Sequence, residues 1–362
     1  MEWSPIQKAA TLFIAVLFLT SFAGIDRWNS FLGTQPYFQG WILYAYFFLF
    51  FLLVSQSRIK LERWAYILTG SATIVAFLAI GQWVQVNLLG HNLPTYAGRV
   101  VSTFGQPNFY SGFILLILPF HYFLLKRHTR GGFLVMVGFL ISIMAVILSQ
   151  SRVAFLMLGG LTVIFLISQF HSPIKRLVTL TLALAIFLIS LLVSASLWSG
   201  FFAKEVIEPI FVKDPDLTEL SVENRIYIWP VAWQLILQKP TTGYGLENIS
   251  FAFADYFTTN KHTLFEETLN ISPVLISLKE LNIDRSHNYT LDLLMFSGIL
   301  GLLAWIILVF LLIKQIVLSS VKPDNTVLLI GLFTYLVWIQ FQNQSVVHLI
   351  YFWLLLGLID RD

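Results

Sequence analysis

One histidine stands where a polar loop meets an apolar run, and its position suits acid–base chemistry. His287 ends a polar segment that begins at Asp284, and the apolar run starts near residue 290. We therefore predict that His287 lies in the first turn of a membrane helix. The positive end of a helix dipole disfavours a charged imidazole, and a neutral imidazole near pH 7 is what a general base requires. Asp292 could orient the ring.

Structural roles are the alternative for the same residues. A lone histidine is often a hydrogen-bonded structural group rather than a base. Asp292 could simply complement the helix N-terminus, and Ser286 or Asn288 could cap it.

Three arginines lie near the ends of other apolar runs. Arg99 precedes the segment 100–108, Arg152 follows Ser151, and Arg225 opens a segment with helical periodicity. A guanidinium at a membrane boundary is costly unless it has a partner, and its planar fork matches phosphate oxygens. Together the three could hold the pyrophosphate of a lipid-linked donor. Each could instead snorkel to the interface or pair with an acid of the loop.

Composition decides which elements must position these groups. Hydrophobic residues make up 57% of the 362 residues and charged residues 11%, and the mean hydropathy is +0.78. These values exclude an ordinary soluble domain and predict an all-α polytopic membrane protein. Cysteine is absent, which excludes a disulfide framework, a thiolate metal site and a cysteine nucleophile.

Ten apolar runs are candidate membrane helices, since a helix needs about 20 mainly apolar residues to cross the hydrocarbon core. They are 9–25, 38–55, 64–86, 109–125, 132–149, 153–170, 177–199, 290–313, 326–343 and 346–359. We expect the first to be an uncleaved span. The last two, which a polar stretch separates, could instead form one long kinked helix.

The placement of positive charge predicts the topology, because short cytoplasmic loops collect Lys and Arg. With Lys8 inside, the other basic clusters of the short loops also fall on the cytoplasmic face. Both termini are then cytoplasmic, and the loop 200–289 lies outside. The net charge of +3 says nothing about nucleic acid.

The chain is expected to form a single membrane domain, 1–362. It would consist of seven membrane helices in 1–199, the large extracytoplasmic loop 200–289 and two to three membrane helices in 290–362. Within the loop, an apolar face of Ile226, Trp229, Ala232, Trp233 and Ile236 predicts an amphipathic helix over 224–237, lying along the membrane surface. An aromatic patch at 251–257 could rest at the headgroup level or pack within the loop.

An ordered set of motifs resembles the bacterial O-antigen ligase and O-antigen polymerase superfamily. The set begins with Arg99 and Ser-Thr-Phe-Gly-Gln-Pro-Asn over 102–108, and continues with Ser151-Arg152 and Glu223-Asn224-Arg225 before Trp229. It ends with Pro240, Gly243 and Gly245, then Ser286-His287-Asn288 with Gly298 and Gly301. The resemblance covers roughly residues 95–310.

What the resemblance implies is a metal-independent, inverting glycosyltransferase with a membrane fold of the GT-C type. Its donor would be a glycan linked to undecaprenyl diphosphate, and its place the cytoplasmic (inner) membrane of a bacterium. His287 would activate the acceptor hydroxyl, Arg152 and Arg225 would bind the diphosphate, and Arg99 would assist. No cofactor is expected. The acceptor would be a lipid, a glycan or a protein, with membrane lipid around the chain and no nucleic acid.

Two departures and two alternatives accompany this prediction. Ligases of the family have about twelve spans, whereas about ten are expected here, and Asn288 replaces a second histidine of some ligases. A repeat-unit polymerase or a protein O-glycosyltransferase would use the same chemistry. From another class, the chain could be a bicarbonate-type transporter, for which the polar cluster 340–348 is the candidate internal path.

Overall fold

The computed structural model describes residues 2–96, 98–127, 131–169, 223–259, 283–318 and 323–361. Every regular element within these ranges is a helix, which confirms the all-α prediction. By its contacts the chain divides into two compact units, each of which is described by itself. The predicted span 177–199 lies outside the described residues.

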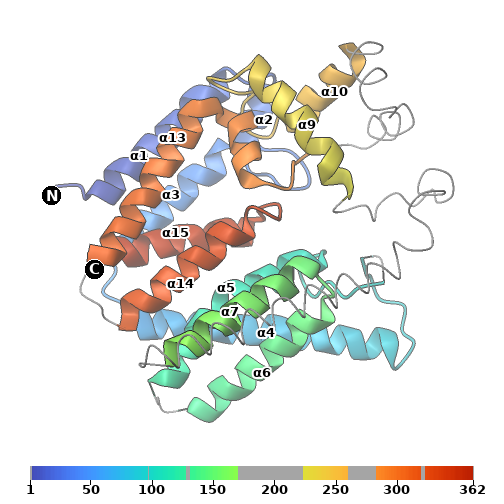
Figure 1. Ribbon diagram of the computed structural model, residues 1–362, viewed down its shortest axis with the longest axis vertical. Coiled ribbons are helices and arrows are strands. Elements are labelled where there is room, and N and C mark those ends of the chain that lie inside the picture. Colours follow the sequence, from blue (N-terminus) through green and yellow to red (C-terminus); the bar gives the residue numbers. More distant parts are fainter. Residues whose placement is uncertain are drawn as a thin grey trace. The chain divides into compact units, whose positions relative to one another are not determined.

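The first unit joins segments from both ends of the chain. Its most extensive helix contact is between α1 (Pro5–Phe22) and α13 (Tyr289–Leu318), and α15 (Val346–Asp360) packs along α3 (Trp41–Ser55) (Figure 1). The unit also contains α2 (Arg27–Leu32), α9 (Glu223–Gln238), α10 (Ile249–Thr259) and residues 323–332 of α14 (Pro323–Trp338). The unit therefore brings the N-terminal helices against the helix that follows His287.

The second unit is centred on α5 (Pro107–Lys126) and also includes the end of α14, Phe333–Trp338. Helix α5 contacts α4 (Leu61–Asn87), α6 (Gly132–Leu148) and α7 (Arg152–Gln169). It is also the most deeply buried of the long apolar helices. Arg99 and Arg152 belong to this unit.

Local sequence explains where several helices begin. Ser4 caps α1 with a capping box completed by Gln7, which satisfies two of the otherwise unpaired amides of the first turn. Pro107 occupies the first turn of α5, where its missing amide hydrogen costs nothing and its fixed φ suits the helix.

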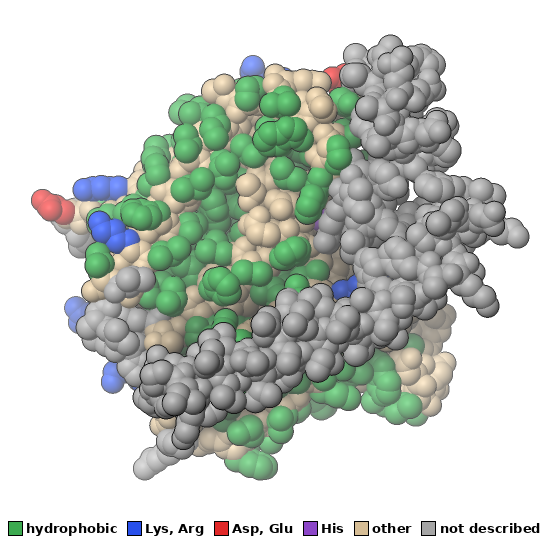
Figure 2. Space-filling model, viewed as in Figure 1, with side chains coloured by type: hydrophobic (Ala, Val, Ile, Leu, Met, Phe, Trp, Pro, Cys, Tyr) green, Lys and Arg blue, Asp and Glu red, His purple; other side chains and the backbone are tan. Residues whose placement is uncertain are grey.

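The helices are long and apolar enough for a polytopic membrane protein. Four described helices meet the length and composition of a membrane span: α1, α4, α5 and residues Tyr289–Ile316 of α13. Five shorter apolar helices coincide with further predicted runs. Large hydrophobic side chains are also abundant on the surface of the described part (Figure 2). Such a surface is unfavourable in water and suits lipid. The total number of crossings, the GT-C topology and the predicted domain limits stay predictions.

The region 326–359 forms two helices rather than one. α14 (Pro323–Trp338) ends before a turn of polar residues, and α15 begins after Ser345, which caps it with His348. The single kinked helix that the sequence also allowed is therefore wrong. The turn 339–345 between the two helices supplies backbone carbonyls to neighbouring segments. Ile339 O accepts from Tyr289 N, and Gln344 O accepts from Gln39 Nε2.

Candidate functional site

His287 lies in an irregular bend immediately before α13. Its φ is +60°, a left-handed conformation that residues other than glycine adopt infrequently and that carries strain. Its side chain is half-buried. The prediction that His287 occupies the first turn of the helix is therefore wrong, because α13 begins two residues later, at Tyr289. The reason is that the Oδ1 atom of Asn288 accepts from Leu291 N at 3.1 Å, so Asn288 is the cap and His287 precedes it.

The groups on either side of His287 are fixed by hydrogen bonds. Ser286 N donates to Asp292 Oδ1 at 2.7 Å, and Trp229 Nε1 donates to Ser286 O at 2.9 Å. Asn288 Nδ2 donates to Gln340 O at 3.2 Å. The bend is thus held by α9, by α13 and by the turn between α14 and α15. Asp292 acts here on the Ser286 backbone; its predicted contact with the imidazole ring stays a prediction.

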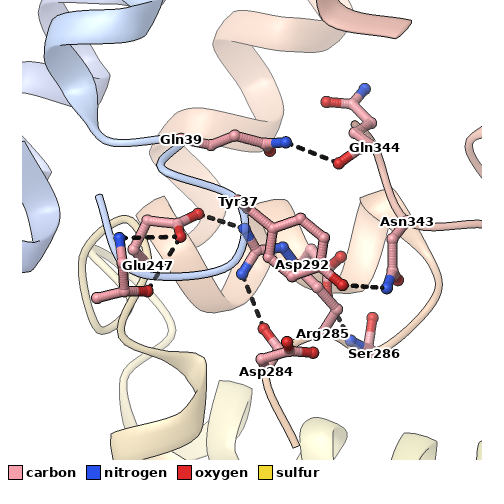
Figure 3. A network of polar contacts seen from close by, with 10 residues as sticks. Tyr37, Gln39, Glu247, Asp284, Arg285, Ser286, Asp292, Asn343 and Gln344 are labelled. Carbon is pink, nitrogen blue, oxygen red and sulfur yellow. Dashed lines mark hydrogen bonds and ion pairs between the residues drawn. The ribbon is translucent and has the colours of Figure 1, made fainter. Parts of the chain in front are cut away.

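Arg285 sits at the centre of a buried polar network beside this bend (Figure 3). Its side chain is 4% exposed and forms an ion pair with Glu247, whose side chain is fully buried. The guanidinium also stacks over the ring of Tyr37, 4.3 Å from the centroid, and donates to Asp284 O at 2.8 Å. Glu247 in turn accepts from Thr34 Oγ1 at 3.2 Å.

The network continues into the turn between α14 and α15. Asn343 Nδ2 donates to the hydroxyl of Tyr37 at 3.0 Å, and Gln39 Nε2 donates to Gln344 O at 2.8 Å. Figure 3 shows these side chains converging from the α2–α3 loop, the loop after α9, the segment before α13 and the α14–α15 turn. Four separate parts of the chain therefore meet in the network around Arg285, and the α14–α15 turn joins it through Tyr37 and Gln39.

Burial and charge set the protonation of this network. Burial raises the pKa of Asp284, and the Arg285 guanidinium opposes that shift. Burial also raises the pKa of Tyr37 to about 12, so its hydroxyl is neutral at physiological pH. For Arg285, burial lowers the pKa, but the neighbouring carboxylates of Glu247 and Asp292 outweigh it, and the pKa is raised. The arginine therefore stays charged.

A break in α13 docks the loop that carries Glu247. Gly298 has φ +61° and ψ −160° inside the helix, a conformation that only glycine adopts readily. The break frees backbone groups of α13 for the loop after α9: Tyr244 N donates to Met295 O at 2.7 Å, Gly245 N donates to Phe296 O at 2.9 Å, and Ile299 N donates to Pro240 O at 2.8 Å. We call this arrangement the α13 joint. It places residue 247 next to residue 285.

The helix predicted over 224–237 is confirmed as α9, and its predicted apolar face is partly buried in the protein, at Ala232 and Ile236. Trp229 and Trp233 are 36% and 50% exposed. The buried side is formed by Ile228, Val231, Ala232, Leu235 and Ile236. α9 packs against α13 and α10. The indole nitrogen of Trp229 donates to Ser286 O, while part of its ring stays exposed at the surface. The position of α9 along a membrane surface stays a prediction.

The aromatic patch of α10 is divided in the same way. Phe253 and Tyr256 are buried, whereas Phe251 is 44% exposed. Packing within the protein, the alternative that the sequence left open, therefore holds for two of its members.

Arg152 is the first residue of α7, and its side chain is exposed. Ser151 caps this helix, since its Oγ accepts from Ala154 N at 3.3 Å. Gln150 just before it has a φ of +51°. A capped helix N-terminus with an arginine at its first position presents amide hydrogens and a guanidinium together, which is an arrangement that favours anions.

Arg99 lies in a short hairpin ahead of α5. Its backbone pairs with Tyr96 in both directions at 3.0 Å, and its guanidinium stands 5.6 Å from the centroid of that ring. Gln82 of α4 holds the following residues, since its Oε1 accepts from Val101 N and Ser102 N at 2.9 Å. The hairpin is therefore tied to the second unit.

The four predicted site residues are divided between the units. Arg225 is in the first turn of α9, in the same unit as His287, while Arg99 and Arg152 are in the other. The side chain of Arg225 lies outside the described part. The convergence of the three arginines on His287, and the functional roles of all four, therefore stay predictions. As for metals, the described residues contain no group of three or more His, Asp or Glu side chains placed to hold an ion.

Sequence reasoning missed the buried network. It noted Arg285 only as part of a polar segment and gave no role to Glu247, Tyr37 or Asn343. The sequence did contain one signal, since a charged residue, Arg285, lies two positions before the proposed base His287. Nothing in the sequence, however, pairs it with an acid 38 residues away.

Comparison with known proteins identifies relatives for most of this chain. The family model described as O-antigen ligase matches residues 137–306, which include Arg152, Arg225 and His287. The general O-oligosaccharyltransferase of Acinetobacter baylyi is 28% identical over 286 residues, or 71% of this chain and 44% of the relative.

Two further relatives agree with that match. A candidate polysaccharide ligase of Rickettsia conorii is 28% identical over 231 residues, covering 59% of this chain and 47% of the relative. The ComP-specific O-oligosaccharyltransferase of Acinetobacter baylyi is 25% identical over 308 residues, covering 82% and 50%. The chain thus spans about half the length of the curated relatives it matches.

Proposed function

Because this chain belongs to the O-antigen ligase-like superfamily, we propose that it transfers a preassembled glycan from a lipid diphosphate carrier to an acceptor hydroxyl. The carrier would be undecaprenyl diphosphate, and the reaction would take place at the outer face of the bacterial cytoplasmic membrane. The proposal is carried by one observation: the matched domain contains a half-buried histidine in a strained, fixed bend outside any helix. Strained backbone of this kind is typical of functional sites.

The reaction would be a single inverting displacement. His287 accepts the proton of the acceptor hydroxyl as its oxygen attacks the anomeric carbon. The new glycosidic bond forms while the bond to the diphosphate oxygen breaks, and its electron pair leaves with the lipid diphosphate. A group that stabilises the growing negative charge on that leaving group lowers the barrier.

Arg152 is the group best suited to that second task. Its exposed guanidinium stands at a capped helix N-terminus, where both the fork and the dipole favour phosphate oxygens. Arg225 would take the same role from α9, and Arg99 would assist.

The test is transfer by purified protein with metals chelated. The donor is an oligosaccharide on undecaprenyl diphosphate, and the acceptors are a panel of lipids, glycans and proteins. Parent protein is expected to form product with at least one acceptor, whereas His287→Ala is expected to fold normally and form none. Activity retained in His287→Ala would remove the base assignment, and no donor consumption with any acceptor would remove the enzyme.

The acceptor class can be read from the products of the same assay. A ladder of repeats indicates a polymerase, and a single transferred block indicates a ligase. A protein acceptor is the second candidate, since two of the relatives carry the name O-oligosaccharyltransferase.

A further inference from the structure

We propose that Arg285 is a positioning residue, which holds the backbone of His287 in its bend through the buried pair with Glu247 and the stack on Tyr37. The inference rests on the proposed function, because it assigns Arg285 to the same reaction. It extends that function to three segments of the chain that contain no proposed reacting group: the α2–α3 loop, the loop after α9 and the turn between α14 and α15.

The first support is the burial of the ion pair. Arg285 is 4% exposed and Glu247 is fully buried at its side chain. A buried pair stabilises a fold little compared with apolar residues of the same size. Such a pair can instead add geometric specificity, because a planar guanidinium fixes the direction from which each partner binds it.

The second support is that strained backbone lies at Glu247 itself and at His287, two residues after Arg285. Glu247 and His287 have the same φ of +60°, and neither is a glycine. Such conformations persist only where the surroundings fix them. For Glu247 these surroundings are the α13 joint and Thr34; for the bend they are Asp292, Trp229 and Gln340.

The third support is the way Arg285 completes that set of restraints. Ser286 is held by Asp292 and Trp229, and Asn288 is held by Gln340. Arg285, directly before Ser286, adds the buried ion pair with Glu247 on the N-terminal side of the bend. It fixes the bend to Tyr37, which Asn343 holds in turn at 3.0 Å. A base displaced by about 1 Å can lose about 100-fold in rate.

The experiment compares kcat and KM for donor across three variants. Arg285→Lys keeps the charge but loses the planar fork and the stack. Tyr37→Leu removes only the ring beneath the guanidinium. The double variant Arg285→Met/Glu247→Leu removes the whole buried pair, a change that a fold often tolerates. Each is expected to lower kcat by about 10- to 100-fold and to leave KM within about threefold.

A matched control separates positioning from general stability. Asp360 accepts from Gln7 Nε2 at 2.8 Å, so Asp360→Asn weakens another polar contact between two segments of the same unit. It lies about 20 Å along α15 from the turn that contacts Asn288. Asp360→Asn is expected to lower the Tm and leave kcat unchanged.

Three results would overturn the inference. The first is a parental kcat in Arg285→Lys. The second is a parental kcat in the double variant when its Tm equals that of the parent. The third is a loss of kcat that is proportional to the loss of Tm in all variants, the Asp360→Asn control included. The outcome is separable from the proposed function. Parent activity with loss in His287→Ala supports the proposed function even where Arg285→Lys retains full kcat.

Discussion

Replacing Gly298 by alanine tests the α13 joint, because the joint depends on a backbone that alanine does not adopt readily. Gly298 has φ +61°, and a Cβ built there would lie 2.2 Å from Thr241 O and 2.6 Å from Thr242 N. Both contacts are to backbone, which cannot turn away as a flexible side chain can. The loop after α9 must therefore separate from α13, or α13 must change its path.

The cost has two parts. An unfavourable φ/ψ costs about 1–3 kcal/mol. Separation of the joint also removes three backbone hydrogen bonds of 2.7–2.9 Å, each of which contributes about 0.5–1.5 kcal/mol. Together the loss is about 2.5–7.5 kcal/mol, which is at the upper end for a single substitution. It corresponds to a fall in Tm on the order of 10 °C.

The assay is thermal unfolding of detergent-solubilised protein, with glycan transfer measured on the same samples. Gly81→Ala is the matched control, since Gly81 lies in α4 with no heavy atom within 4 Å of a built Cβ, and alanine there is expected to be neutral or stabilising by up to about 1 kcal/mol. Equal Tm values for Gly298→Ala and Gly81→Ala would refute the joint. Transfer should fall with the joint, because Glu247 is on the loop that it docks.

Three other perturbations have defined outcomes. Because burial raises the pKa of Asp284, the folded protein binds this proton more tightly than the unfolded chain, and its stability rises as pH falls through the raised pKa towards 3.8. At pH 7 the ionised carboxylate is unfavourable in the fold, so Asp284→Asn should have a higher Tm than the parent. This difference should shrink between pH 7 and pH 4, and a constant difference would contradict the raised pKa. Asn288→Ala removes the cap of α13 and should cost about 0.5–2 kcal/mol in denaturant unfolding, whereas Asn288→Asp should keep most of it, and equal losses in both would contradict capping. Arg152→Ala should lower kcat/KM for the lipid diphosphate donor by about 10- to 100-fold, the loss of a charge-assisted hydrogen bond, with Arg152→Lys intermediate; parental kinetics in Arg152→Ala would remove it from the diphosphate site.

The helices could be predicted because each apolar run carries its own signal. The runs at 109–125 and 132–149 match α5 and α6 within two residues at each end, since length and hydropathy fix a membrane helix without reference to its neighbours. The buried face of α9 was not predictable from its periodicity. Which residues of α9 are buried depends on its contacts with α13 and α10, which are distant in the sequence or set by the loop between them.

The candidate site shows the same limit. His287 could be selected from its type and its place at the start of a helix. The cap at Asn288 then moved it out of the first turn, a difference that depends on one side-chain hydrogen bond. The pair of Arg285 and Glu247 depends on the break at Gly298, and a helical pattern continues through that break without any change in hydropathy. Contacts between distant segments of this kind leave no local signal.

The most direct test of the account is the rate of release of undecaprenyl diphosphate from a glycan-linked donor in a single turnover, in the presence of EDTA and a saturating acceptor. Parent protein and His287→Asn are compared at equal donor occupancy. Loss of the base should lower the rate by about 100- to 10,000-fold, since general-base catalysis supplies that much, while donor affinity stays unchanged. Equal rates in the two proteins, or no release by the parent, would contradict a histidine-dependent glycan transfer.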